Sequence, residues 1–265
     1  MGLRAIAALL LLGGAQCAFP IDLKPATASE FDRYVQQAEQ RLNRRKVFLW
    51  ADESADRKQR VLNGEVVVEP ADSRPITELP DGLIHDWIGT VFVPGVSLAS
   101  TLEHIQDYDH ARTSHREVTE SRIIWHHGND YLVYMRLLKK KVITVVLNSE
   151  HEIHYSQVDA TRWKSQSKSV KIAEVDNPGR KDERELPDGS GHGFLWKLDT
   201  FWRFQERDGG TWIECEAISL TRDIPTGLGW LIEPIIRSLP RESLENTLRE
   251  TANALKQHET LRPQH

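Results

Sequence analysis

The sequence predicts an α+β fold, built mainly from antiparallel strands with helices packed on the sheet. Short stretches rich in β-branched and aromatic residues follow one another along most of the chain, and several are joined by glycine-containing turns. Amphipathic helical patterns stand near the beginning, near the middle and at the end. Strands and helices do not alternate regularly, as they would in a parallel α/β fold.

Residues 1–18 have the pattern of a secretory signal peptide. Arg4 precedes an apolar run, and small residues follow that run. The run is too short to span a bilayer. A lipoprotein signal would make Cys17 the lipidated residue, although Gln16 suits that signal poorly. We expect cleavage near Ala18 and export of the protein, which would then be secreted or periplasmic.

The remaining chain, residues 19–265, is expected to form one domain with its core at about 30–258. The sequence has two cysteines, Cys17 and Cys215, so cleavage would leave no partner for an intrachain disulfide. The formal net charge of −5 shows no basic excess. Nucleic acid is therefore not an expected partner.

The first part of the chain predicts two helices and two strands. A helix is expected at residues 29–46, where apolar side chains share one face and Ser29 with Asp32 resembles a capping box. The other elements expected here are a polar loop at 52–59, strands at 61–69 and 83–93, and a helix at 97–108.

The second part predicts a series of antiparallel strands. A Gly-Asn-Asp turn separates the first pair, and Asp-Gly-Gly separates the last. The expected strands are 117–125, 131–138, 142–155, 159–175, 194–206 and 211–221. Residues 176–193 are polar and contain several glycines and prolines, so they are expected to form a solvent-exposed insertion.

The end of the chain combines an apolar segment with an amphipathic helix. Residues 222–239 are too apolar for an ordinary surface loop, but Pro225, Gly227 and Gly229 disfavour a helix. A helix is expected from about Pro240. One face of it is expected to lie on the sheet, and that face carries Leu244, Leu248, Thr251, Ala252 and Leu255.

The strand at Trp212–Leu220, followed by the apolar loop and the helix, resembles the end of a START-related domain of the helix-grip superfamily. The resemblance covers about residues 30–258 and depends on the order of the elements. It implies a curved antiparallel sheet wrapped around a long C-terminal helix, with a hydrophobic cavity between them. It also implies a hydrophobic small molecule or lipid as partner, with transient membrane contact as a possible accompaniment.

The sequence offers no clear catalytic or metal-binding pattern. His126 and His127 are adjacent on a strand and would point to opposite faces, so two exposed turn histidines are expected. Glu214 and Glu216 share a strand face, which fits an acid–base pair or a solvated outer face, and the alternation favours the second. Cys215 is expected to be a buried small hydrophobe. No catalytic residue, metal or cofactor is predicted.

Aromatic and aliphatic residues on the inner sheet face or on the apolar loop are the candidates for the cavity wall. The ligand-binding residues expected are Trp125, Met135, Trp196, Trp202, Trp230 and Ile232. A carrier of a hydrophobic molecule is preferred over a cyclase- or hydrolase-type enzyme that would use a polar residue in the same cavity. A protein whose own side chains fill the cavity is the third alternative.

The apolar segment 223–239 has two interpretations. As a gate it would open the cavity, with Gly227 and Gly229 as hinges. As a static plug it would pack permanently on the C-terminal helix. Both need the same apolar residues, so the sequence does not choose between them.

Overall fold

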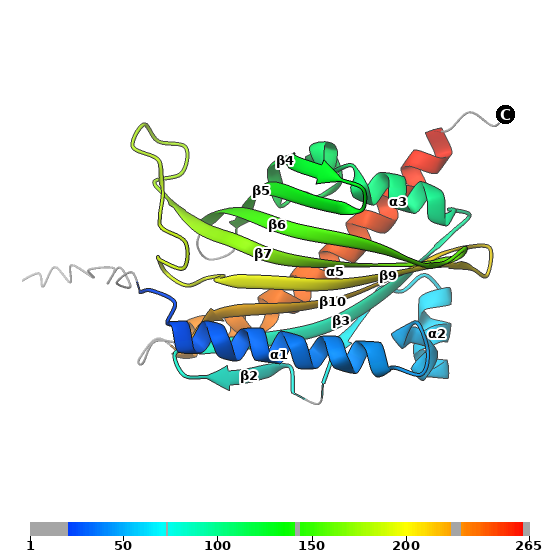
Figure 1. Ribbon diagram of the computed structural model, residues 1–265, viewed down its shortest axis with the longest axis horizontal. Helices are drawn as coiled ribbons and strands as arrows, with labels where there is room; N and C mark the ends of the chain where they lie inside the picture. Colours follow the sequence, from blue (N-terminus) through cyan, green and yellow to red (C-terminus); the bar gives the residue numbers. More distant parts are fainter. Residues whose placement is uncertain (1–20, 73, 141–143, 224–228, 262–265) are drawn as a thin grey trace, which may run out of the picture.

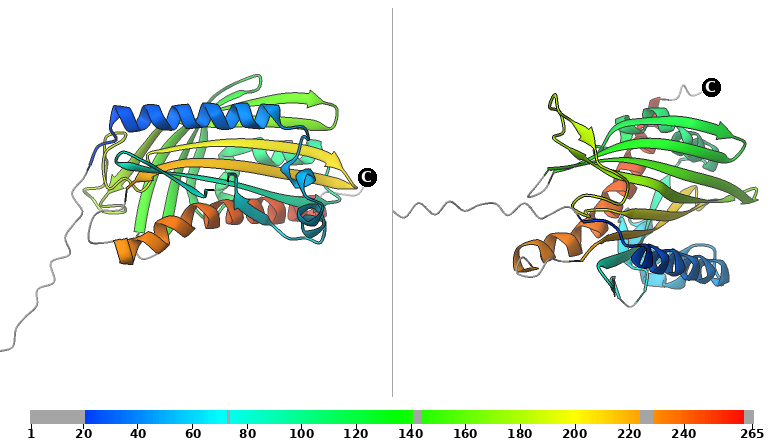
Figure 2. Two further views of the ribbon diagram at one scale, coloured as in Figure 1. Left: turned by 90° about the horizontal axis from the view of Figure 1, so that it is seen from below. Right: turned by 60° about the vertical axis from the view of Figure 1, so that its left-hand side comes forward.

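The computed structural model describes residues 21–72, 74–140, 144–223 and 229–261, and for 229–237 and Leu261 it describes the backbone alone. Two long helices lie on opposite faces of one large antiparallel sheet, as Figures 1 and 2 show. The face toward the C-terminal helix is called the inner face below, and the face toward the first helix the outer face. The sheet curves around the C-terminal helix, which confirms the helix-grip arrangement expected from the sequence.

The helices lie at the beginning, in the middle and at the end of the chain. They are α1 (Pro25–Arg44), η1 (Trp50–Glu53), α2 (Ala55–Leu62), α3 (Leu98–Gln106), η2 (Tyr108–His110), α4 (Ala111–Ser114) and α5 (Gly229–Leu261). Among the described residues, none of them has a stretch both long enough and apolar enough to cross a membrane.

The strands pair in the order β1-β3-β10-β9-β7-β6-β5-β4, with β2 beside β3 and β8 beside β7. All these pairings are antiparallel. The strands are β1 (Val67–Pro70), β2 (Ile76–Leu79), β3 (Gly82–Pro94), β4 (Val118–His127), β5 (Asp130–Lys140), β6 (Thr144–Asp159), β7 (Arg162–Asp176), β8 (Arg184–Glu185), β9 (Lys197–Arg207) and β10 (Gly210–Arg222).

Helix α5 covers only part of the inner face. It packs against β3, β1 and β10, and Leu248 and Leu255 are fully buried there. Gly89 of β3 makes this close approach possible, because a Cβ atom there would lie 2.6 Å from Cδ1 of Leu248. On the outer face, the apolar side of α1 packs on β3, β9 and β10 through Phe31, Val35 and their neighbours.

The expected polar loop at 52–59 and strand at 61–69 were wrong in part. Residues 55–62 form α2, and the strand begins only at Val67. Ser54 caps α2 by accepting a hydrogen bond from the backbone N–H of Arg57. Helix α1 also begins earlier than expected, at Pro25 instead of Ser29, because proline suits the first helical turn.

The loop expected at 222–239 was wrong from Gly229 onward, where α5 begins. Pro234 and Pro240 lie inside this helix. A proline removes one backbone hydrogen bond, and the burial of Leu244, Leu248 and Leu255 later in the helix stabilises α5 despite that local signal. Residues 224–228, with Gly227, lie outside the described residues, so a hinge there stays a prediction.

Glu214 and Glu216 correct another expectation. Both were expected on a solvated outer face, and both are 1% exposed beneath α1. Arg45 donates to Glu214 at 2.6 Å and Arg41 to Glu216 at 2.5 Å. The side chains of β10 alternate between the two faces as expected. The arginines at the end of α1, and not water, cover the face that carries the two carboxylates.

Candidate ligand-binding cavity

A cavity of about 1190 Å³ lies between α5 and the part of the sheet that α5 does not contact closely. Strands β5, β6, β7, β9 and β10 form its floor. Helices α3 and α4 close one end, and the segment after β7 borders the other. The cavity exists because α5 docks on β3 and stands away from β6 and β7.

The lining is chiefly apolar. Its apolar members come from the sheet and from helices, and they include Met135, Leu137, Val146, Leu147, Ile153, Leu198, Trp202, Ala217 and Leu244. The inner face of β10 carries small side chains, namely Cys215, Ala217 and Ser219. Small residues on a strand face leave space that larger ones would fill, so β10 contributes directly to the cavity volume.

The structure brings together two of the six residues expected to bind a ligand. Met135 of β5 and Trp202 of β9 both line the cavity. Their contact with a ligand stays a prediction. The side chains of Trp230 and Ile232 lie outside the described residues.

Trp125 and Trp196 lie elsewhere. Trp125 is 45% exposed on β4, because an irregularity in the pairing between Ile123 and Trp125 reverses the inward alternation. Trp196 is 4% exposed and packs on the α1 side, with Phe201. It precedes β9, which begins at Lys197, so the strand alternation does not extend back to it.

Histidines at the closed end of the cavity were not expected there. His104 of α3, His115 after α4 and His258 of α5 all line the wall. His104 Nε2 lies 3.3 Å from Oγ of Ser114, and His115 Nδ1 lies 3.7 Å from Oε2 of Glu250. Burial lowers the pKa of both His104 and His115. These residues come from separate elements, so no local spacing in the sequence could have indicated the cluster.

The segment expected as a solvent-exposed insertion borders the other end of the cavity. Glu174 is 5% exposed and accepts hydrogen bonds from the backbone N–H and the ring of His192, at 2.8 and 2.9 Å. Gly191 has a φ of +117°, and a Cβ there would lie 2.7 Å from a Glu174 oxygen. Glycine at that position therefore allows the segment to close on the carboxylate.

Two further polar groups of the wall satisfy each other. The hydroxyls of Tyr108 and Tyr155 are 2.6 Å apart, and both residues are buried. Near α5, Lys139 donates to Glu117 and to Ser243. The charged and hydroxyl groups named here thus have partners within the protein. Within the described residues, no group of three or more His, Cys, Asp or Glu side chains could hold a metal ion.

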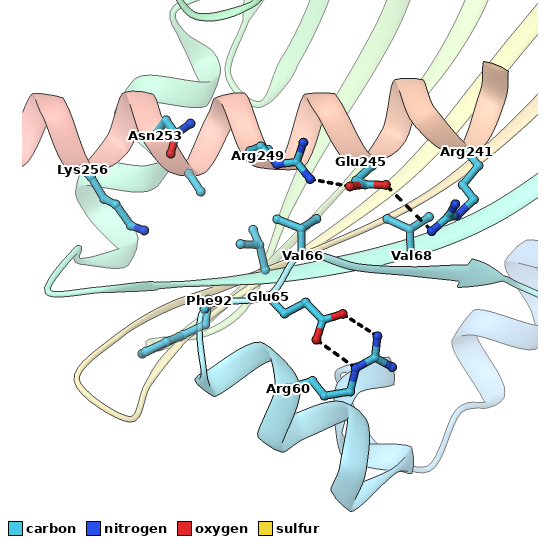
Figure 3. A pocket seen from close by; sticks show the side chains of 13 residues that line it. Arg60, Glu65, Val66, Val68, Phe92, Arg241, Glu245, Arg249, Asn253 and Lys256 are labelled. Atoms are coloured by element: carbon cyan, nitrogen blue, oxygen red, sulfur yellow. Dashed lines mark hydrogen bonds and ion pairs between the residues drawn. The ribbon is translucent and has the colours of Figure 1, made fainter. Parts of the chain in front are cut away.

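A second, smaller hollow of about 500 Å³ lies between α5 and the elements α2 and β1 (Figure 3). Its charged residues largely pair with one another. Arg60 meets Glu65 at 2.6 Å, and Glu245 pairs with both Arg249 and Arg241. Exposed pairs of this kind contribute little to stability or specificity. The large apolar cavity is therefore the stronger candidate for a functional site.

No protein-family model matches the chain, and no curated protein matches its sequence. Its fold is similar to several solved structures. A STAR-related lipid transfer protein fragment from Xanthomonas axonopodis is 13% identical with a TM-score of 0.48, and the match covers 72% of this chain and 98% of that one. Human STARD10 is 10% identical with a TM-score of 0.45, covering 84% and 89%.

The di-domain ARO/CYC StfQ from the steffimycin biosynthetic pathway is 11% identical with a TM-score of 0.43, covering 88% of this chain and 62% of that one. These similarities are too low to transfer a ligand or an activity, so the ligand has to be argued from the residues of this chain's own cavity.

Proposed function

We propose that this chain binds and carries a hydrophobic small molecule or lipid in the cavity between the sheet and α5. The observation that carries the proposal is the cavity itself, about 1190 Å³ and chiefly apolar. Ligand sites typically occupy ~300–1000 Å³ and are lined mostly by hydrophobic side chains with a few polar groups. The volume is sufficient for a ligand of lipid size.

The cavity has an energetic consequence. Apolar space left empty destabilises a fold, because the lining side chains lose contacts on one side. An occupant that binds only the folded state stabilises it by about 2.7 kcal/mol at a hundredfold excess over its Kd. For a domain of this size that corresponds to a rise of roughly 5–11 °C in Tm.

A carrier is favoured over an enzyme by the groups around the cavity. A serine nucleophile needs a base, and that base needs a third group to orient it. Ser114 and His104 are within reach of each other, but within the described part of the chain no carboxylate hydrogen-bonds to His104. Burial raises the pKa of Cys215 well above its usual value, so its thiol stays protonated and unreactive.

The test is native mass spectrometry of the purified protein, followed by thermal shift with fatty acids, phospholipids, quinones and sterols. We expect a co-purifying apolar molecule and stabilisation by at least one of the four classes. Ala217→Phe should fill the floor of the cavity and abolish the shift. Val158→Phe is the matched control, because Val158 is 44% exposed on β6 and does not line the cavity.

Two outcomes would contradict the proposal. If no class stabilises the protein and nothing co-purifies, its own side chains fill the cavity in solution. If an added compound is converted with time, and Ala217→Phe stops that conversion, the protein is an enzyme of the cyclase or hydrolase type.

We also propose that the protein works outside the cytoplasm, after removal of residues 1–18, and contacts membranes transiently to exchange its ligand. The signal-peptide pattern supports export. N-terminal sequencing of the protein from cell fractions tests it. A start near Phe19 outside the cytoplasm is expected, whereas a lipidated Cys17 would make it a membrane-anchored protein.

A further inference from the structure

His151 has a distinctive position on the cavity floor. It lies in the middle of β6, where it pairs with Val133 of β5 and Ser169 of β7. The side chain is 6% exposed and lines the cavity. The pairing of β6 with β7 is irregular at this point, and Val170 is the extra residue. Such bulges often redirect a side chain next to a functional site.

The imidazole has no partner in the protein. Within the part of the chain that the structure describes, neither ring nitrogen makes a hydrogen bond, and burial is the sole cause of its altered pKa. Neither ring nitrogen is among the fully buried atoms that lack a partner, so the nitrogens are accessible from the cavity. A ligand group in the cavity can therefore hydrogen-bond to the ring.

The surroundings of His151 are polar but uncharged. Hydroxyl side chains line the floor beside it, namely those of Ser165 and Ser167 on β7 and Thr200 on β9. Of the charged groups of the wall, Glu174 pairs with His192 and Lys139 with Glu117. Arg222, near His192 at the end of the cavity, donates to the carbonyl oxygen of His192.

The imidazole itself is neutral at physiological pH. Burial lowers the pKa of His151 to about 4. A neutral imidazole donates through one ring nitrogen and accepts through the other. It can therefore satisfy a hydroxyl or a carbonyl. It offers no charge to balance a buried carboxylate or phosphate, which would cost several kcal/mol if left unpaired.

We propose that the ligand of this cavity is an apolar molecule bearing an uncharged hydroxyl or carbonyl group, and that this group hydrogen-bonds to His151. The inference rests on the proposed carrier function and narrows its ligand class to alcohols, ketones and related neutral lipids. It makes His151 the residue that determines specificity.

The experiment compares three probes of equal chain length, which are dodecane, 1-dodecanol and dodecanoate. Their dissociation constants are measured by displacement of a fluorescent apolar dye from the full chain. The selectivity is the Kd for dodecane divided by the Kd for dodecanol. The selectivity is determined for the wild type, for His151→Leu and His151→Gln, and for the control His154→Leu. Circular dichroism establishes that each variant is folded.

We expect His151→Leu to lower the selectivity by about two- to tenfold, the equivalent of one net hydrogen bond. His151→Gln keeps a neutral hydrogen-bond donor and acceptor, so this variant should retain most of the selectivity. His154→Leu removes an imidazole from the same strand, where the side chain is 58% exposed and pairs with Asp130, so it should leave the selectivity unaltered. In ¹⁵N-histidine spectra of the wild type, dodecanol should shift the ring signals of His151 while the ring stays neutral at pH 7.

Three results would overturn the inference in distinguishable ways. If the probes bind with the same selectivity in the wild type and in His151→Leu, the carrier function stands and His151 has no role in recognition. If dodecanoate binds most tightly, with a protonated His151, the ligand is an anion. If none of the three displaces the dye from the wild type, the proposed function fails, and this inference with it.

Discussion

The ion pair between Arg45 and Glu214 lies beneath α1, and its removal should be among the costliest single changes on the outer face. Glu214 is 1% exposed and accepts hydrogen bonds from Arg45 at 2.6 Å and from the backbone N–H of Trp50 at 2.5 Å. The Arg45 side chain is 9% exposed. Removing one partner of a buried pair leaves the other charge uncompensated.

Arg45→Met keeps the apolar stem and removes the charge, so it isolates the electrostatic effect. We expect a loss of about 3–5 kcal/mol in unfolding free energy, the range for breaking a buried pair. The exposed contact of Arg45 with Glu53 adds little. The fall in Tm should be about 6–20 °C.

The loss should depend on pH with a definite sign. Burial raises the pKa of Glu214, and Arg45 opposes that rise. Without Arg45 the pKa should rise further, so the carboxyl group of the variant takes up a proton on folding. A raised folded-state pKa gives stability that is present at low pH and lost as pH rises. Arg45→Met should therefore cost less at pH 5 than at pH 8.

Urea unfolding of Arg45→Met, Glu214→Gln and the double variant measures the energetic coupling between the two side chains. The double variant should lose less unfolding free energy than the two single variants lose together. Arg33→Met is the matched control, because Arg33 lies on α1, which Arg45 follows directly, and pairs with Glu30 in solvent. It should cost less than about 1 kcal/mol. If Arg45→Met costs no more than Arg33→Met, the buried pair does not hold α1 on the sheet.

Three further predictions concern other parts of the fold. Burial raises the pKa of Asp199 to about 7, so its stabilising effect should be lost as pH rises from about 4 through 7. Asp199→Asn should flatten that part of the stability–pH curve in urea titrations, and an unchanged curve would contradict the assignment. Gly89→Ala should cost ~1–3 kcal/mol by forcing Leu248 aside, and adding Leu248→Ala should cost less than it does in the wild type. Tyr155→Phe should cost about 1 kcal/mol in thermal melts, because Tyr108 loses its hydroxyl partner, and no loss would mean that water replaces it.

Much of the fold could be predicted from local patterns. Glycine turns marked the hairpins, and the apolar face of α5 was correct from Leu244 to Leu255 because a 3.6-residue period is a local property. The start of α5 was not predictable in the same way. Gly229 and Pro234 are local signals against a helix, while the packing that stabilises α5 comes from β3, far away in the sequence.

The site was harder to predict because it depends on which face another element covers. Alternation predicted that Glu214 and Glu216 point away from Cys215, and they do, since both contact arginines on the α1 side while Cys215 lines the cavity. It could not predict that Arg41 of α1 and Arg45, the residue that follows the helix, would cover them. Two arginines spaced in this way indicate partners for two carboxylates on a strand only once the helix is known to lie over that strand.

On β9 and β10 the outer face is filled by packing against α1, while part of the inner face borders the cavity. On the outer face, large side chains such as Trp196, Phe201 and Phe31 pack tightly between α1 and the sheet. On the inner face, Cys215 and Ala217 leave space for the cavity, while Phe204 and Ile213 of the same strands pack in one core cluster with residues of α5. Because side chains alternate along a strand, substitutions on adjacent residues should separate the two properties, one changing unfolding free energy and the other changing ligand binding. The cavity can therefore be large without loss of the fold, since the core under α1 and the core around α5 both hold the strands.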